Sequence, residues 1–154
     1  MSDRKRPLDG IRVLDIATFI AAPMAASILG EFGAEVIKIE QPREGDPLRR
    51  FGVPSVATDD TFCWLSEARN KKSVTLDLKQ PAGRALLLQL VAQADAVVEN
   101  FRPGAMARLG LAYEDLKQVN PRIVLLSISG YWQRVIVGVV VLVAILIDLL
   151  RRNR

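Results

Sequence analysis

Basic side chains recur in turns and loops of this sequence, where they could hold phosphate groups. Guanidinium and ammonium groups bind phosphate through charge-assisted hydrogen bonds. If these residues follow the carboxyl ends of strands, they predict an anion-binding edge; the alternative is an ordinary solvated, charged surface. The candidates are Arg69, Lys71, Lys72, Arg102 and Arg108, with Arg43, Arg49 and Arg50 in a long loop.

An amide and an aromatic ring are adjacent at Asn100 and Phe101, directly after a predicted strand. Such a pair could stack on a purine and hydrogen-bond to it, although a turn with core packing would use the same residues. Glu40 ends another strand, where a dinucleotide-binding domain places its ribose-binding acid. The preceding loop ATFIAAP lacks the glycine-rich fingerprint, which argues against a dinucleotide site.

The composition excludes several classes of site. The sequence contains no His, which excludes His-based acid–base chemistry and argues against a metal site. Cys63 is the single cysteine, so no intrachain disulfide can form and a reducing, cytoplasmic compartment is expected. The first residues, MSDRKRP, lack the apolar region of a secretory signal. No basic stripe with interleaved aromatic residues predicts nucleic-acid binding.

Strands alternating with helices must position these residues. The apolar run 11–16 predicts a buried strand, a helix opens near Pro23, Gly33 ends it, and a second strand covers 36–40. Parallel strands joined by a helix bring their following loops to one edge of the sheet. We expect the first helix to bury one apolar stripe, formed by Met24, Ile28, Leu29 and Phe32.

The same alternation continues to residue 128. Together these elements predict an α/β fold: an incomplete Rossmann-like, mainly parallel sheet with flanking helices. A helix at 61–68 should turn Phe62, Trp64 and Leu65 inward. The further predicted elements are a loop at 41–61, strands at 73–78, 95–99 and 123–128, a helix from Pro81, and short helices at 105–109 and 113–119.

The character of the chain changes after Tyr131. Residues 135–147 are all apolar or Gly, and RRNR follows shortly afterwards. This run is shorter than the ~20 residues that cross a bilayer. We therefore expect an α/β part at 1–131 and an apolar C-terminal helix with a basic end at 132–154, with membrane contact through 135–150 as an alternative.

Several segments, in this order and spacing, resemble the class III CoA-transferases (formyl-CoA transferase, or CaiB/BaiF, type). The resemblance covers about residues 7–131. It implies CoA thioesters as substrates, no metal, and an interlocked homodimer. The segments are LDGIRVLDIATFIAAPMAASILGEFGAEVIKIEQP, GDPLRR, RNKKSVTLDLK, ADAVVENFRPGAMARLGL and NPRIVLLSISGY.

The resemblance also implies roles for individual residues. Thr18, Ile20 and Ala21 would line the pantetheine and adenine side of CoA. Lys38 to Gln41 would lie beside the adenosine, and Asn70, Lys71 and Lys72 would contact the phosphates or nucleotide. Asn100 and Phe101 would flank the pantetheine, and Arg108 would bind a phosphate.

The tail departs from this family. Family members use a nucleophilic Asp that lies beyond the SGY turn, and no residue of this chain corresponds to it. Residues 132–154 instead weakly resemble the C-terminal end of a sugar ABC-transporter permease. The resulting expectation is a CoA-binding N-terminal fragment, inactive alone. The alternatives are a fragment of a 2-methylacyl-CoA racemase, a membrane-associated protein defined by its tail, and a non-functional remnant.

Overall fold

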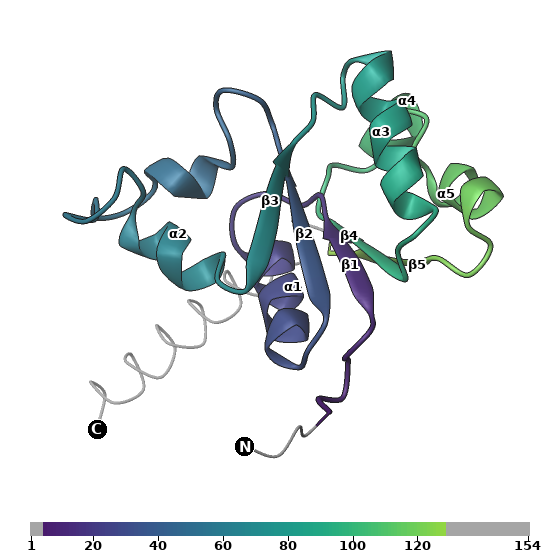
Figure 1. Ribbon diagram of the computed structural model, residues 1–154. Helices are drawn as coiled ribbons and strands as arrows, with labels where there is room; N and C mark the ends of the chain where they lie inside the picture. Colours follow the sequence, from purple (N-terminus) through teal and green to yellow (C-terminus); the bar gives the residue numbers. More distant parts are fainter. Residues whose placement is uncertain (1–4, 129–154) are drawn as a thin grey trace, which may run out of the picture.

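The fold is built around one parallel sheet, whose strands lie next to one another in the computed structural model, which describes residues 5–128 (Figure 1). All of its strand pairs are parallel, in the order β3-β2-β1-β4-β5. This is the strand order of a Rossmann-type sheet. The strands are β1 (Arg12–Asp15), β2 (Glu35–Glu40), β3 (Lys71–Thr75), β4 (Ala96–Glu99) and β5 (Val124–Ser127).

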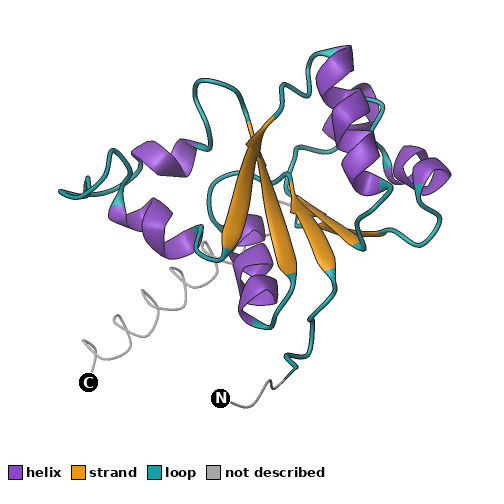
Figure 2. Ribbon diagram, in the orientation of Figure 1, coloured by secondary structure: helices purple, strands orange, loops and turns teal. Residues whose placement is uncertain are grey.

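Helices lie on both sides of this sheet (Figure 2). α1 packs on one face, and α3, α4 and α5 pack on the other. A 3₁₀ helix and α2 lie in the connection between β2 and β3. The helices are α1 (Ala21–Glu31), η1 (Pro47–Arg50), α2 (Phe62–Glu67), α3 (Pro81–Val91), α4 (Ala105–Arg108) and α5 (Tyr113–Val119).

The core has one apolar layer on each face of the sheet. Because side chains alternate along a strand, neighbouring residues of β1 enter different layers. Val13 joins α1 with Val36 and Val98, whereas Leu14 joins the layer under α3 and α5. The predicted α/β fold with a parallel sheet and flanking helices is therefore confirmed.

The expected apolar stripe of α1 is wrong. Met24 is 44% exposed and Phe32 is 52% exposed, while the side chains of Ala22 and Ala26 are fully buried. The helix packs through small residues, which let its axis approach the sheet closely. Its end is as predicted, because Gly33 takes a φ of +112° and donates to the carbonyl of Gly30.

The orientation predicted for α2 is correct only for Trp64. Phe62 is 54% exposed and Leu65 is 43% exposed, whereas Trp64 is 8% exposed. Thr61 caps the helix by accepting a hydrogen bond from the Trp64 N–H. The Trp64 ring lies 3.9 Å from the guanidinium carbon of Arg49, which anchors α2 to η1.

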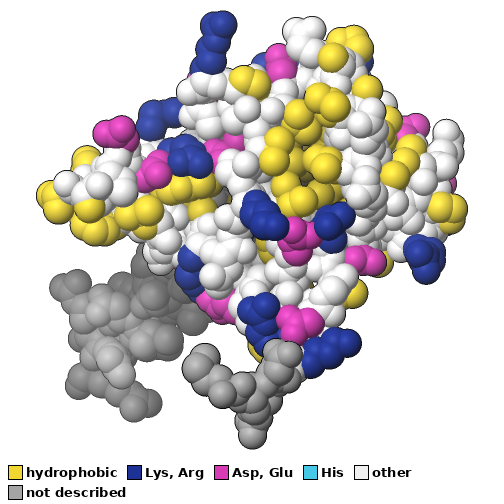
Figure 3. Space-filling view, viewed as in Figure 1, with side chains coloured by type: hydrophobic (Ala, Val, Ile, Leu, Met, Phe, Trp, Pro, Cys, Tyr) yellow, Lys and Arg dark blue, Asp and Glu magenta, His cyan; other side chains and the backbone are white. Residues whose placement is uncertain are grey.

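The open face of the sheet beside α3 retains apolar surface. Figure 3 shows hydrophobic side chains gathered in the hollow between β3 and α3. Val74 of β3 and Leu86 of α3 are among the exposed large hydrophobic residues, so Leu86 lies outside the buried face of its helix, which Leu87 and Val91 form.

The remaining elements match the predictions closely, apart from β3, which begins and ends earlier than the predicted 73–78. Within residues 5–128, no helix combines the length and the apolar character needed to cross a bilayer. The expected tail helix, its membrane contact through 135–150 and the SGY turn lie outside the described residues.

Candidate functional site

A cavity of about 230 Å³ opens at the carboxyl ends of the strands. We call this end of the sheet the carboxyl edge. Residues that follow β1, β2, β3 and β4 all contribute to the cavity wall, so one pocket collects four loops. Its lining comprises Ile16, Thr18, Ile39, Glu40, Gln41, Glu44, Gly45, Asp46, Pro47, Leu76, Asp77, Leu78, Lys79, Phe101 and Leu109.

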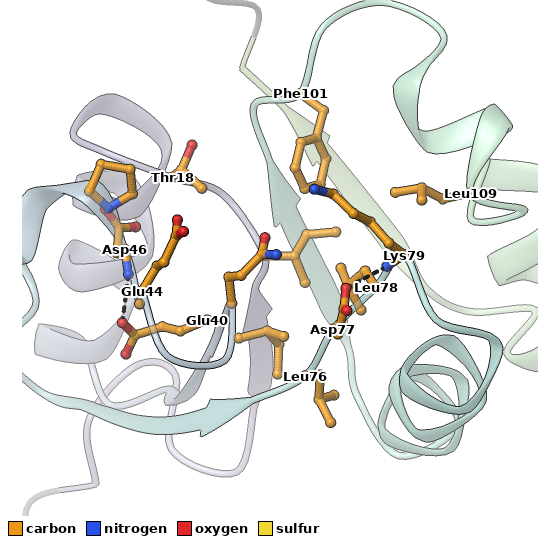
Figure 4. A pocket seen from close by; sticks show the side chains of 15 residues that line it. Thr18, Glu40, Glu44, Asp46, Leu76, Asp77, Leu78, Lys79, Phe101 and Leu109 are labelled. Atoms are coloured by element: carbon orange, nitrogen blue, oxygen red, sulfur yellow. Dashed lines mark hydrogen bonds between the residues drawn. The ribbon is translucent and has the colours of Figure 1, made fainter.

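The two sides of this cavity differ in chemistry (Figure 4). Phe101, Leu109 and Leu78 form an apolar side, and the Lys79 side chain extends toward the Phe101 ring. Glu44 and Asp46 lie across from them, near Thr18. An aromatic ring beside a cation and apolar side chains can hold a flat heterocycle that carries phosphate.

Asn100 joins the loops that follow β1 and β4. The strand order of the sheet reverses between these two strands, and we call this place the switch point. The Oδ1 of Asn100 accepts a hydrogen bond from the Thr18 N–H at 2.9 Å, and its Nδ2 donates to the Thr18 carbonyl at 2.7 Å. Both polar groups of the Asn100 amide are therefore engaged by a single residue of the β1–α1 loop, which fixes where Thr18 lies.

A buried ionic cluster lies between the sheet and the start of α1. Lys38 Nζ is 2.9 Å from Asp46 Oδ2 and 3.6 Å from Asp15 Oδ1, and it also donates to the Ala17 carbonyl. Lys71 Nζ is 2.8 Å from Asp15 Oδ2 and donates to the Pro23 carbonyl. Burial lowers the pKa of Lys71, and the charge of Asp15 opposes that shift.

Glu40 forms a second buried ion pair at the same edge. Burial raises the pKa of Glu40, but hydrogen bonds from Arg49, Ser73 and the Asp46 N–H outweigh it and lower the pKa to about 2. Arg49 contacts Glu40 through two nitrogens, at 2.7 and 2.8 Å, and also pairs with Asp60. The hydrogen bond from Arg49 to Glu40 is the main reason why the pKa of Arg49 is raised.

The structure brings part of the predicted site together. Thr18, Gln41 and Phe101 line the cavity. Ile20 is the N-cap residue of α1 and Ala21 is its first residue, two and three positions after the lining residue Thr18.

The expected position of the basic turn is wrong. Asn70, Lys71 and Lys72 lie at the amino end of β3, because Lys71 is paired in register with Val36 near the start of β2. The Lys72 ammonium pairs with Glu35 at 2.6 Å at the amino end of the strands, the opposite end of the sheet from the cavity. Lys71 instead turns into the buried ionic cluster, where its side chain is 2% exposed.

Arg102 and Arg108 do not line this cavity. Arg102 contributes to a separate hollow of about 260 Å³ beside the ends of β4 and β5, together with Glu99 and Ser127. Arg108 is the last residue of α4. Arg49, from the long loop, is committed to Glu40 and Asp60.

Sequence reasoning missed the contribution of the segment after β3. Leu76, Leu78 and Lys79 line the cavity, although VTLDLK was assigned to a strand as far as Leu78. The available signal was Pro81: because a helix opens there, the residues just before it had to form the loop at the carboxyl edge. Among residues 5–128, no group of three or more acidic, His or Cys side chains could hold a metal ion.

Comparisons with known proteins found relatives that match most of this chain. A succinyl-CoA–L-malate CoA-transferase alpha subunit of Chloroflexus aurantiacus is 58% identical over 127 residues, which cover 82% of this chain and 30% of that protein. A human succinyl-CoA:glutarate CoA-transferase is 44% identical over 128 residues, covering 83% of this chain and 29% of that one.

A solved CaiB/BaiF family protein of Brucella suis superposes with a TM-score of 0.76 at 38% identity, covering 82% of this chain and 34% of that structure. The chain therefore spans about a third or less of the length of these relatives. The model of CoA-transferase family III matches residues 8–153. Because this match covers most of the sequence and the fold is shared, the chain belongs to CoA-transferase family III.

Proposed function

We propose that this chain binds the nucleotide end of coenzyme A or an acyl-CoA in the cavity at the carboxyl edge. The observation that carries the proposal is the cavity wall itself, in which Phe101, Leu78 and Leu109 form an apolar side and the Lys79 side chain extends toward the Phe101 ring. Adenine stacks on aromatic and apolar surfaces, and the attached phosphates require a cation. Thr18 and Gln41 supply polar groups at the mouth of the same cavity.

The remaining predicted residues then divide into three groups. Lys38, Lys71 and Asn100 act indirectly, because their polar atoms already bond to protein groups that hold the β1–α1 loop. Ile20 and Ala21 lie at the start of α1, and we propose that they contact the pantetheine arm. Asn70, Lys72 and Arg108 are left as predicted phosphate contacts that lie outside the cavity wall.

The reaction that we propose for the complete site is transfer of CoA from an acyl-CoA to a carboxylate. The Chloroflexus aurantiacus and human relatives named above are both CoA-transferases, which favours transfer over racemisation. Within residues 5–128 the buried carboxylates of Asp15, Glu40 and Asp46 are each paired with a Lys or Arg, so we assign none of them as the nucleophile. The contribution of this chain is then binding and orientation of the thioester carrier.

Two further expectations belong to this proposal. We place the chain in the cytoplasm, since Cys63 is its single cysteine and CoA thioesters are its proposed ligands. We also propose a homodimer, as the family resemblance implies. We propose that such a dimer buries the exposed apolar side chains of α1, which are Met24, Ile28 and Phe32.

Calorimetric titration of the 154-residue chain with CoA and succinyl-CoA tests the binding proposal. We expect saturable binding that weakens about tenfold in Phe101→Ala and in Lys79→Met, as loss of one stacking or charged contact would give. Lys117→Met is the matched control, because Lys117 lies over Tyr113 on α5 and not in the cavity. Absence of heat and of any thermal shift at millimolar CoA would overturn the proposal.

A further inference from the structure

Asp46 occupies an unusual position in the loop after β2. Its side chain is 1% exposed, and both of its oxygens accept hydrogen bonds. Oδ1 accepts from the N–H groups of Phe19 at 3.1 Å and Leu48 at 2.9 Å, and Oδ2 lies 2.9 Å from Lys38 Nζ. One carboxylate therefore joins β2, the loop that follows it, and the β1–α1 loop.

The Phe19 backbone needs such a partner. Its φ of +70° lies in the left-handed region, which a residue with a Cβ adopts at a cost of about 1 kcal/mol. The Asp46 carboxylate receives the Phe19 N–H in this conformation, with Oδ2 also within 3.2 Å. Because Thr18 precedes Phe19 and lines the cavity, the peptide that Asp46 holds determines one wall of the cavity.

Lys38 completes the arrangement on the other side of Thr18. Its ammonium donates to the Ala17 carbonyl while it pairs with Asp46. Lys38 and Asp46 thus hold the peptide groups that flank Thr18, and each neutralises the buried charge of the other. A buried ion pair contributes little net stability compared with an apolar pair of the same volume, so its geometric role explains it better.

We infer that Asp46 is a positioning residue: its charged carboxylate, paired with Lys38, holds Phe19 in the left-handed conformation and so sets the cavity wall that receives CoA. The effect on CoA rests on the proposed function, whereas the effect on Phe19 does not. Asp46→Asn tests it, because an Asn amide nitrogen can only donate and would face either the Lys38 ammonium or the Leu48 N–H.

Two readouts are needed on the full chain. The first is hydrogen exchange of the Phe19 amide, resolved by NMR without ligand, and the second is the dissociation constant for CoA. In Asp46→Asn we expect the Phe19 amide to exchange at least about tenfold faster and CoA to bind about tenfold more weakly. Asp60→Asn is the control of identical chemistry, since Asp60 pairs with Arg49 at 2.8 Å and its carboxylate bonds to no β1–α1 loop residue.

A second control separates positioning from general loss of stability. Val91→Ala removes fully buried volume from α3 at a residue that does not line the cavity and does not contact Asp46, so it should lower Tm while leaving Phe19 exchange and CoA affinity as in the parent chain. If Val91→Ala reproduced the effects of Asp46→Asn, or if Phe19 exchange were unchanged in Asp46→Asn, the inference would be wrong. Faster exchange with an unchanged CoA affinity would also overturn it.

Failure of the proposed function has a different signature. If the parent chain bound no CoA but Asp46→Asn still accelerated exchange at Phe19 alone, Asp46 would position the loop for another ligand and the binding proposal would fall. If CoA bound the parent chain and the variant equally, with the same exchange at Phe19, the binding proposal would stand and the role of Asp46 would fall.

Discussion

Asn100 and Thr18 are joined by two hydrogen bonds that leave no polar atom of the Asn100 amide without a protein partner. In the sequence, β2, β3 and the helices between them separate the two residues, yet these meet where β1 and β4 end side by side. This contact closes the loops on the two sides of the switch point, where ligands of parallel α/β sheets bind. Asn100 therefore gives its loop a fixed position beside the cavity.

Replacing Asn100 by Ala should loosen that closure. The N–H and carbonyl of Thr18 would lose their side-chain partners, and we expect the free energy of unfolding to fall by about 1–3 kcal/mol. CoA affinity should fall as well, because Thr18 lines the cavity. Urea unfolding and calorimetric titration measure the two effects.

Asn120 offers a matched control for this variant. Its Nδ2 donates to the carbonyls of Val91 at 3.0 Å and Ala94 at 2.7 Å, and its Oδ1 accepts from the Arg122 N–H at 3.1 Å, so Asn120→Ala also removes hydrogen bonds to backbone groups, three in all. Asn120 does not line the cavity. A similar loss of stability with unchanged CoA affinity is expected, and equal weakening of CoA binding in both variants would contradict the role given to Asn100.

The fold could be read from the sequence because its signals are local. Apolar runs such as 11–16, Pro81 at a helix start and Gly33 at a helix end each depend on a few neighbouring residues. The apolar stripe of α1 was misassigned because burial depends on the partner surface. Ala22 and Ala26 fit closely against the sheet, and no property of the helix alone reveals that preference.

The candidate site was predicted less completely for the same reason. Thr18, Gln41 and Phe101 follow strands directly, so their common edge could be inferred. Lys38 was expected beside the adenosine and Lys71 at the phosphates or nucleotide, but each ammonium meets a carboxylate from a distant segment, Asp46 or Asp15. Pairings across such separations depend on the register of the sheet, which local sequence does not encode.

Glu40 should make stability depend on acid pH. Its pKa is about 2 in the folded chain and 4.5 ordinarily, so its contribution is fully present above about pH 4.5 and is lost as the pH falls toward 2. That contribution is on the order of 2 kcal/mol. In Glu40→Gln, unfolding free energies measured in urea should lie below those of the parent at neutral pH, and the two curves should converge as acid is added. Parallel curves would contradict the assignment.

Removing Asp15 should be among the most damaging single changes. Asp15→Asn removes one buried carboxylate. The Lys71 ammonium loses its carboxylate partner, and Lys38 keeps only the carboxylate of Asp46. Breaking a buried pair in this way costs about 3–5 kcal/mol of unfolding free energy. The double variant Asp15→Asn with Lys71→Met removes the unpaired ammonium and should recover much of the loss in a urea titration. A single variant within about 0.5 kcal/mol of the parent would show that water reaches the cluster.

Phe19 allows its backbone conformation to be tested apart from its side chain. Phe19→Gly and Phe19→Ala both remove the edge-to-face contact with Phe51, whose ring centroid lies 5.1 Å away. Because the φ of Phe19 is +70°, Gly adopts the native backbone more easily than Ala, and we expect Phe19→Gly to be more stable by about 1 kcal/mol. The same pair of substitutions at Phe51, where φ is −102°, should give the opposite order, because there Gly only adds entropy to the unfolded chain. Thermal unfolding of the four variants measures both differences, and a shared order at the two positions would mean that the left-handed conformation of Phe19 is not maintained in solution.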